Sequence, residues 1–425
     1  MLYQRSILFS LLILGIIALN ISYNCSSQDY QYPRYGEIEP YIHTVNSIDV
    51  DHTDFSDLAF LDSIIGNKQI IFLGEQLHSD GSTFQAKSRL IRYLHEKHNF
   101  NVVLYEAGLH DMWFMNNIAR QQVEDVAQFT PAIGLYYFWW DNEECKSLWE
   151  YYNNTLKSNN PIILGGFDVQ LTGTSKDKNT RAKALNDFLL EKHIDLEKYS
   201  SFNGVVKQLS TTYMWEYRHF SQTKFDSIQT DLKNILNQLP EPITEEDNIY
   251  YRYIKGIHDY GQLMWDYNPG EMPRMNARDS LMADNLIWQI DSLYNNQKII
   301  IWSANLHLFK SSLTNEGVIF TPLGKYIKDK YPDTSYMMAF TSYALANPNS
   351  RDLYSEAGVN SLEYVLHSKK YKYAYINMSD IDSDSFLKKE FISVINQRAN
   401  EKHDWSNLVD GLFYIDAIST INQKY

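Results

Sequence analysis

Short apolar segments that each end in a polar residue constrain the fold of this chain more than any other feature. The clearest is KQIIFLGEQLH at residues 68–78, where the apolar run stops at Gly74 and two titratable residues, Glu75 and His78, follow. An apolar run that stops at a glycine is typical of a buried strand. A carboxylate and an imidazole at the end of such a strand are poorly explained by packing, and they suit proton transfer or metal ligation.

The segments that come next continue this organisation. A stretch of helical spacing begins with Ser82, and Gln85 three residues later predicts a capping box, so a helix should start near Thr83. NVVLYEAG at residues 101–108 is a second buried strand, and it carries Glu106 at its end. A strand, a helix and a strand in this order predict a parallel crossover unit.

Further apolar runs recur at 161–167, 298–302 and 335–340. Near-continuous apolar runs separated by helical stretches indicate a mostly parallel central sheet with helices on both faces. Residues 180–295 show helical periodicity and no good strand, so they predict a largely helical insertion. The predicted fold class is therefore α/β, with this insertion added to the sheet.

The N-terminus has the pattern of a targeting segment. Arg5 precedes an apolar stretch at 7–19 that is too short to span a bilayer comfortably, and Cys25 stands where a bacterial lipoprotein would be cut and acylated. We expect export to the periplasm, outer membrane or cell surface, with a lipid anchor at Cys25 as the only membrane contact. Plain secretion and an uncleaved anchor are the alternatives. The predicted divisions are a targeting segment at 1–25, a tether at 26–54 and a folded domain at 55–425.

Composition restricts the partners and the sources of stability. The net charge of −14 and the lack of any basic run argue against a nucleic-acid partner, because phosphate binding needs clustered lysines and arginines. Only Cys25 and Cys145 are present, so disulfides are not a major source of stability.

Titratable residues gather at the predicted carboxyl ends of the strands, where ligands bind to open parallel sheets. Each alone has an ordinary structural explanation, such as a helix cap, an ion pair, a turn or a core histidine. Their convergence on one edge favours a functional site. The residues are Glu75, His78, Glu106, Asp168 and His307.

Two arginines complete the candidate site. Arg89 lies nearly three turns along the helix after His78, and Arg278 lies in the first turn of a predicted helix at 276–288. Arginine pairs well with carboxylates and anionic groups. We expect Arg89, Arg278 and Asp168 to bind substrate. Glu143 and Glu144 are weaker candidates that equally suit the start of the next helix.

The absence of a G-x-S-x-G elbow, a P-loop and an HExxH motif leaves water as the best nucleophile for a hydrolysis. Either His78 deprotonates that water, or a metal ion lowers its pKa. Glu75 or Glu106 would orient the histidine, and His307 or Arg89 would stabilise the developing charge. The same two histidines and two glutamates would also suit a metal site.

Several motifs in this order resemble the erythromycin esterase family over residues from about 55 to 324. The resemblance rests on GEQLH, RLIRYL, NVVLYEA, WWDNEE, ILGGFDVQ, NARDSLMADN and IIIWSANLH. It implies a metal-independent hydrolase in which His78 activates water and Glu75, Arg89, Glu106 and His307 form the remainder of the site. Named members of the family cleave a macrolide lactone ester.

The chain departs from the family pattern W-x-HN-x-H at one position, since Ala304 replaces the first histidine. This change removes one candidate contact to substrate or oxyanion, while the base is retained. Our leading hypothesis is an exported, lipid-anchored hydrolase that cleaves a small-molecule ester or lactone without a cofactor. A metal-dependent hydrolase with the ligands Glu75, His78, Glu106 and His307, and a haem-binding lipoprotein of related fold, are the alternatives.

Overall fold

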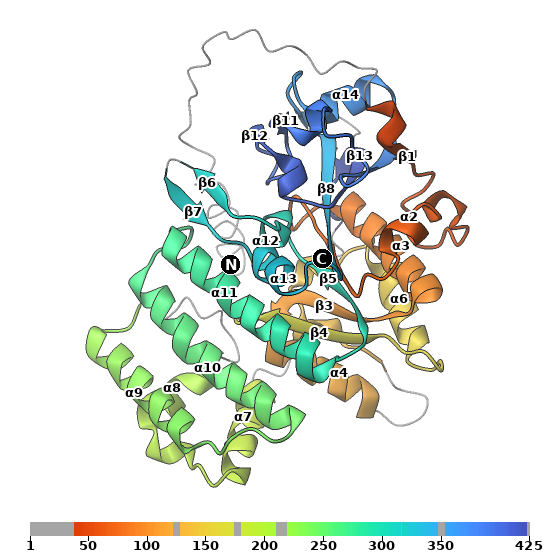
Figure 1. The fold of residues 1–425 in the computed structure, drawn as a ribbon. Coiled ribbons are helices and arrows are strands. Elements are labelled where there is room, and N and C mark those ends of the chain that lie inside the picture. Colours follow the sequence, from red (N-terminus) through yellow and green to blue (C-terminus); the bar gives the residue numbers. More distant parts are fainter. Residues whose placement is uncertain are drawn as a thin grey trace.

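The computed structural model describes residues 38–121, 128–173, 180–209, 219–315, 317–346 and 353–422. The predicted targeting segment, with Cys25, and the first part of the predicted tether lie outside the described residues. Figure 1 shows a central sheet with helices around it and a helical lobe below. Across the described residues, no helix is both long enough and apolar enough to cross a membrane.

The main sheet has nine strands in the order β1-β10-β13-β8-β2-β5-β3-β4, with β9 paired to β8. The strands from β13 to β4 pair in parallel, and β1, β10 and β9 pair antiparallel. The predicted α/β class with a mostly parallel sheet is therefore confirmed. The bounds are β1 Ile42–Thr44, β2 Ile70–Leu73, β3 Phe100–Gly108, β4 Ile163–Asp168, β5 Lys298–Trp302, β8 Ser335–Ala346, β9 Leu353–Glu356, β10 Tyr373–Asn377 and β13 Gly411–Ser419.

Helices cover both faces of the sheet, as predicted. Successive side chains of a strand point to opposite faces, so Ile71 and Leu73 of β2 join one core cluster and Ile70 and Phe72 join the other. The first face packs against α2 (Leu61–Ile65), α3 (Gly81–His98), α4 (Leu109–Gln121) and α6 (Lys146–Thr155). The second packs against α11 (Met272–Trp288), α12 (Asn305–Leu308), α13 (Leu323–Lys330) and α14 (Leu362–Ser368).

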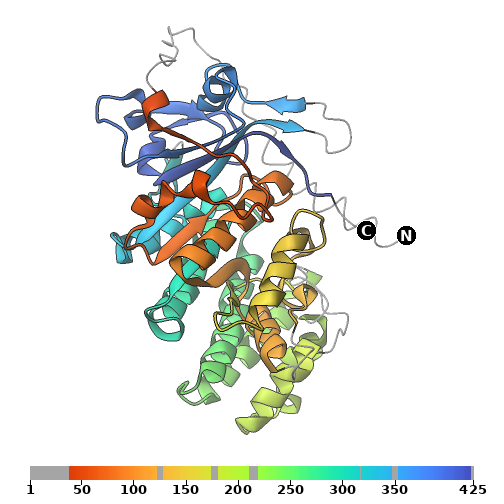
Figure 2. The same cartoon turned by 90° about the vertical axis from the view of Figure 1, so that its right-hand side faces the viewer.

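The described part of residues 180–295 is helical and contains no strand, as the predicted insertion requires. It forms α7 (Thr180–Glu191), α8 (Ser200–Leu209), α9 (Gln222–Gln238), α10 (Glu245–Asp266) and α11. The first four of these helices share a separate hydrophobic core, and they form the yellow and green lobe below the sheet in Figure 2. The last helix, α11, returns the chain to the sheet and contacts β4.

Smaller elements complete the fold. These are α5 (Pro131–Gly134), the hairpin of β6 (Leu313–Asn315) and β7 (Val318–Phe320), and the pair of β11 (Phe391–Ser393) and β12 (Glu401–His403).

The predicted tether is too long at its C-terminal end. The strand β1 pairs with β10 at the edge of the main sheet, and Val45, Ile48 and Val50 are buried. The chain from residue 38 onward therefore belongs to the folded domain. A strand of three residues is too short to show a periodic pattern, which explains the error.

The predicted capping box at Ser82 is also wrong. The helix α3 begins at Gly81 and is capped by Asp80, whose carboxylate accepts the backbone N–H of Thr83 at 3.0 Å. Asp80 is fully buried, and this burial raises the pKa of its carboxyl group to about 7. Ser82 lies inside the first turn and contacts Ser419 at the end of β13 instead.

Candidate active site

The predicted convergence at the carboxyl edge of the sheet is present in the structure. Glu75 follows β2, Glu106 lies near the end of β3, and Asp168 ends β4. Since β5 lies between β2 and β3, the helix α12 that follows β5 brings His307 to the same edge. These residues form two groups, one around His78 and one around Glu106.

Glycine is required at position 74 because side chains of α12 pack closely against the end of β2 there. A Cβ atom on Gly74 would lie 2.0 Å from Oδ1 of Asn305. The backbone N–H of Asn305 donates to the carbonyl of Glu75 at 2.8 Å. This contact fixes the start of the His78 turn against the segment that carries His307.

The first group fixes the tautomer of His78. Its Nδ1 donates to Oε1 of Glu75 at 2.8 Å, which leaves the lone pair of a neutral ring on Nε2. Among the described residues, none forms a hydrogen bond with Nε2. The side chain of His78 is 35% exposed, whereas Glu75 is fully buried. A histidine held in this way by a carboxylate is suited to general-base catalysis.

Two aromatic residues fix the plane of the imidazole ring. Phe138 stacks on His78 with ring centroids 5.3 Å apart, and Trp139 meets its edge at 5.6 Å. The indole N–H of Trp139 also donates to Oε1 of Glu75 at 3.1 Å. Both aromatic residues come from the segment that precedes α6, so this segment supports the base and its carboxylate together.

Lys87 is a site residue that the sequence analysis missed. Its ammonium group is fully buried, donates to Oε2 of Glu75 at 2.7 Å, and lies 4.0 Å from the centroid of the Trp302 ring. Burial lowers the pKa of Lys87 to about 8, although the charge of Glu75 opposes this effect. A usable signal is present in the sequence, because Phe84 and Ile91 place Lys87 on the apolar face of the helix.

The second group is centred on Arg278 of α11. Its guanidinium group donates to Oε1 of Glu106 at 2.9 Å and forms an ion pair with Asp168. The second oxygen of Glu106 accepts the backbone N–H of Ala304 at 2.9 Å. Glu106 and Asp168 therefore both contact Arg278, and these three predicted site residues form one cluster.

His307 joins this group through both of its ring nitrogens. Its Nδ1 contacts Asp279 at 2.8 Å, and its Nε2 contacts Glu106 at 3.2 Å. Burial would lower the pKa of His307, but the charges of Asp279 and Glu106 outweigh it and raise the pKa to about 10. At neutral pH His307 is therefore a cation, and the 3.2 Å approach of Nη1 of Arg278 to Nε2 is not a hydrogen bond.

The surrounding cations keep Glu106 ionised. Burial would raise the pKa of Glu106, but His307 and Arg278 hold it well below the ordinary value. Burial would likewise lower the pKa of Arg278, whereas the charges of Asp168 and Glu106 raise it. The charge of Glu106 in turn opposes the lowering of the pKa of Lys87, which pairs with Glu75, so the two groups lie within electrostatic range of each other.

The prediction that Arg89 binds substrate is wrong. Arg89 is 1% exposed, and its guanidinium group forms a buried ion pair with Asp57. Its remaining N–H groups donate to the backbone carbonyls of Ser47, His52 and Asp54. All five donors of the side chain are used in this way, so Arg89 holds the N-terminal segment against α3.

The four proposed metal ligands do not fit a metal site. Glu75 and His78 pair with each other, and Glu106 pairs with His307, whose other nitrogen is held by Asp279. Among the described residues, no group of three or more His, Cys, Asp or Glu side chains is arranged to hold a metal ion. Nε2 of His78 is the free ring nitrogen of these two histidines.

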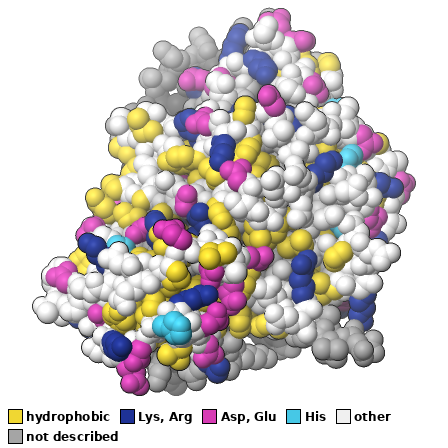
Figure 3. Space-filling model, turned by 60° about the horizontal axis from the view of Figure 1, so that its bottom comes forward, with side chains coloured by type: hydrophobic (Ala, Val, Ile, Leu, Met, Phe, Trp, Pro, Cys, Tyr) yellow, Lys and Arg dark blue, Asp and Glu magenta, His cyan; other side chains and the backbone are white. Residues whose placement is uncertain are grey.

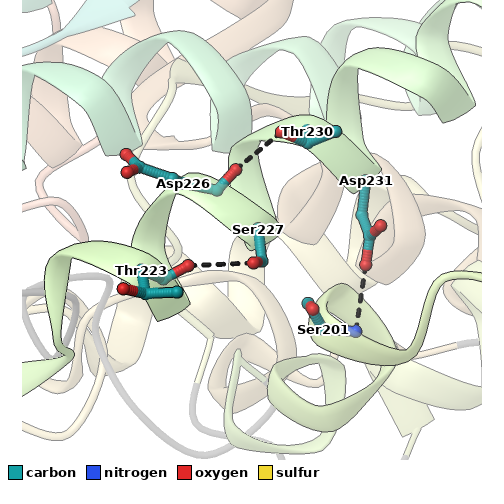
Figure 4. Close-up of a pocket in the computed structure, with 6 residues that line it drawn as sticks. All are labelled: Ser201, Thr223, Asp226, Ser227, Thr230 and Asp231. Atoms are coloured by element: carbon teal, nitrogen blue, oxygen red, sulfur yellow. Dashed lines mark hydrogen bonds between the residues drawn. The ribbon is translucent and has the colours of Figure 1, made fainter.

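Two further hollows occur in the described residues, one in the helical insertion and one beside Asp168. A polar hollow between α8 and α9 is lined by residues such as Asp226 and Asp231, and Asp231 accepts the backbone N–H of Ser201 (Figure 4). A second hollow lies beside Asp168 and is partly lined by His110. On the face shown in Figure 3, basic side chains are scattered among acidic ones.

A mostly parallel sheet with imidazole and carboxylate groups at its carboxyl edge defines the chain as an α/β protein with a strand-end site typical of enzymes. The sequence model of the Erythromycin esterase family matches residues 95–418. The chain therefore belongs to the erythromycin esterase family, whose members are hydrolases. The match begins after the His78 turn, so the role of His78 rests on the geometry described above.

Similar proteins agree with this assignment. The chain is 26% identical to a Bacillus subtilis (strain 168) protein named as a hydrolase, YbfO, over 72% of each chain. It is 24% identical to an erythromycin esterase type II of Escherichia coli, over 71% of this chain and 74% of that protein. A mutant of the erythromycin esterase EreC in its open conformation has a TM-score of 0.65 at 15% identity, covering 90% of this chain and 98% of that one.

A crystal structure of a succinoglycan biosynthesis protein has a TM-score of 0.72 at 18% identity, with 93% of this chain and 100% of that chain covered. These structural likenesses establish the fold of the chain. They do not extend to a substrate.

Proposed function

We propose that this protein hydrolyses a small-molecule ester or lactone, with His78 as the general base that activates water. One observation supports the proposal most. Nδ1 of His78 is held by the buried Glu75, while no described residue forms a hydrogen bond with Nε2. Glu75 itself is held by Lys87 and Trp139, so the orientation of the base is fixed before a substrate binds.

In the proposed reaction, Nε2 of His78 takes a proton from water as the water oxygen attacks the ester carbonyl carbon. The carbonyl oxygen becomes an oxyanion in the tetrahedral intermediate. The C–O bond to the leaving alcohol then breaks, and the alcohol oxygen receives the proton from Nε2. The products are a carboxylic acid and an alcohol, and His78 returns to its neutral form.

Arg278 is the proposed donor to the oxyanion. Its Nε and Nη2 donate to Asp168 and Glu106, whereas among the described residues Nη1 approaches only the cationic His307, which cannot accept a hydrogen bond. Nη1 is therefore available for an incoming oxygen. Fixed donors of this kind stabilise charge that develops in the transition state.

Ala304 separates this site from the family pattern noted above. Its backbone N–H is used by Glu106, and its side chain offers no hydrogen bond. We therefore propose an ester or lactone other than a macrolide as the substrate. Export and a lipid anchor at Cys25 remain part of the proposal, and they rest on the N-terminal sequence alone.

The decisive experiment compares His78→Gln with the wild type on a panel of esters and lactones that includes 4-nitrophenyl acetate and erythromycin. We expect the variant to lose at least about 10²-fold in kcat/KM, which is the usual contribution of a general base. A matched control is His367→Gln. His367 has the same local arrangement, with Nδ1 2.8 Å from Asp416 and a ring stacked 3.9 Å from Tyr343, but it lies on α14.

Full activity in His78→Gln would overturn the proposed base, and loss of activity in His367→Gln would show that the effect is not specific. Elemental analysis before and after dialysis against EDTA tests the metal-dependent alternative. Stoichiometric zinc or manganese that leaves together with the activity would favour that alternative. A Soret band on titration with haem would favour the binding protein.

A further inference from the structure

From the last residue of β13 the chain continues in a short segment that we call the C-terminal strap, Ser419–Asn422. β13 is already fixed between β8 and β10, so the strap is not needed to hold that strand in the sheet. Its contacts are made instead to two loops beside His78. Neither the strap nor the His78 turn lies inside the family match at residues 95–418.

The first set of contacts joins the strap to the turn that carries His78. The backbone N–H of Ile421 donates to the carbonyl of Ser79 at 2.8 Å, directly after His78. Thr420 forms an antiparallel bridge with Asp80, which caps α3. The backbone N–H of Ser419 donates to the hydroxyl of Ser82 at 2.9 Å. The strap therefore lies alongside the segment that runs from the His78 turn to the first turn of α3.

The second set joins the strap to the loop after the aromatic residues. The backbone N–H of Asn422 donates to the carboxylate of Glu144 at 3.0 and 3.2 Å, and its carbonyl accepts the N–H of Glu143 at 3.2 Å. Asn142 in the same loop donates to the carbonyl of Phe138 at 2.9 Å. Hydrogen bonds and one ring stack thus connect the strap to the imidazole of His78 from this side.

The three segments meet at Gly81, where space is lacking for a side chain. A Cβ atom there would lie 2.9 Å from Cγ of Glu144 and 3.2 Å from Cα of Ile421. The side chain of Ile421 packs against the core cluster that contains Trp139. The crossing is therefore tightly packed, and displacement of one segment must move the others.

We propose that the C-terminal strap is a positioning element of the active site, which joins the His78 turn to the Phe138–Trp139 segment and so sets the place of the imidazole ring. The proposal rests on the function of His78 proposed above. The strap residues do not touch the reacting atoms. They act through Ser79 and Glu144 on the two sides of the ring.

Three variants test the strap. Glu144→Ala removes the acceptor for Asn422, and Glu144→Gln keeps a carboxamide oxygen in its place. Gly81→Ala pushes α3, Glu144 and Ile421 apart. Gly204→Ala is the control, because Gly204 lies in α8 and a Cβ there would meet nothing within 4 Å.

The kinetic readout is hydrolysis of 4-nitrophenyl acetate. We expect kcat to fall about ten- to a hundredfold in Glu144→Ala and Gly81→Ala with little change in KM, because a misplaced catalytic group slows the chemical step. Glu144→Gln should restore most of kcat. Gly204→Ala should behave as the wild type.

A second readout does not depend on hydrolysis. In protein labelled at histidine, the ring resonances of His78 are identified by their loss in His78→Gln. They should shift in Glu144→Ala and Gly81→Ala but not in Gly204→Ala. Unchanged His78 resonances in both Glu144→Ala and Gly81→Ala would overturn the proposal even if the enzyme hydrolyses esters. A wild type that hydrolyses no ester would instead overturn the function, while the resonances still decide the role of the strap.

Discussion

Lys87 and Arg89 are both buried cations of α3, yet they serve different parts of the molecule. Two residues along a helix correspond to a rotation of about 200°. Lys87 therefore faces the sheet edge and contacts Glu75, whereas Arg89 faces the N-terminal segment and contacts Asp57. Each cation is compensated by one carboxylate, which is the condition under which charges are tolerated in a protein interior.

We predict that Arg89→Met destabilises the protein without changing its chemistry. The substitution leaves Asp57 and three carbonyls of the N-terminal segment without their donor, so the free energy of unfolding should fall by about 3–5 kcal/mol. Urea denaturation measures this loss, and kcat of the folded protein should match the wild type.

Arg92→Met is the control for that prediction. The side chain of Arg92 is 22% exposed and pairs with Glu96 on the same helix, so the change should cost less than about 1 kcal/mol. A loss of kcat in Arg89→Met at unchanged stability would contradict the structural role and restore Arg89 as a site residue.

At the scale of elements, the candidate site depends on how closely the helix α12 approaches the end of β2. Asn305 donates from its backbone to Glu75, and its side chain binds Phe340 of β8 and the carbonyl of Ile395. The turn after β2 and the helix α12 are thereby fixed to each other and to a third strand. Gly74 permits this arrangement because it has no side chain.

We predict that Gly74→Ala lowers both stability and activity. The new Cβ atom would lie 2.0 Å from Oδ1 of Asn305 and 2.5 Å from the side chain of Leu308. Overpacking of this kind costs about 1–3 kcal/mol, and it should displace α12 with His307. Thermal denaturation and kcat with 4-nitrophenyl acetate measure the two effects.

Gly256→Ala serves as the comparison for Gly74→Ala. A Cβ at this position in α10 makes only ordinary contact with Val169, at 3.6 Å or more, and alanine favours a helix by about 1 kcal/mol over glycine. Equal behaviour of the two variants would show that the approach at Gly74 is not critical.

The sequence predicts those elements whose pattern is continuous and local. The polar ends of β2, β3, β4 and β5 were identifiable because each follows an uninterrupted apolar run. The central strand β13 was missed because Asp416 interrupts its apolar run. The antiparallel strands β1 and β10 were also missed, because β1 has only three residues and the stretch that leads into β10, residues 369–373, mixes tyrosines with lysines. Their place depends on pairing partners more than 300 residues away.

The candidate site was predictable to a similar extent. A histidine or carboxylate after a strand can be placed on the sheet edge by topology alone, which located His78, Glu106 and Asp168. The direction of a side chain on a helix depends on its rotation about the helix axis. The sequence analysis therefore named Arg89 as the site residue, whereas the cation that reaches the site is Lys87, two residues earlier. Asp279, beside Arg278, gains its role only from the fold that brings His307 to it.

At the scale of the whole molecule, His307 connects three regions that are distant in the sequence. It follows β5, pairs with Glu106 of β3, and pairs with Asp279 of α11, which returns from the helical insertion. The charge on this one imidazole therefore supports the attachment of the insertion to the sheet. The same charge contributes to the stability of the folded chain.

We predict a pH dependence of stability from this arrangement. The pKa of His307 is raised to about 10 in the folded state from an ordinary value of 6.5. The contribution of the charged imidazole to the free energy of unfolding is therefore fully present below about pH 6.5 and is lost as the pH rises towards 10. The difference in free energy of unfolding between wild type and His307→Gln should shrink over this range.

Urea denaturation of both proteins at pH 7, 8.5 and 10 measures that difference. Lys87, whose pKa is lowered to about 8, changes its own protonation over the same range in both proteins, so its effect cancels in the comparison. Curves that run parallel from pH 7 to pH 10 would show that the charge of His307 does not support the fold.

The strand order has a consequence for a broken chain. Strands β2, β3 and β4 precede the insertion and β5 follows it, yet β5 lies between β2 and β3. The link between α9 and α10 is an exposed turn in which Ile243 is 90% accessible to solvent. A protease that cut there would release no fragment, because the later piece is interleaved with the earlier one. The nicked enzyme would run as a single species on a native gel and separate into two pieces only in denaturant.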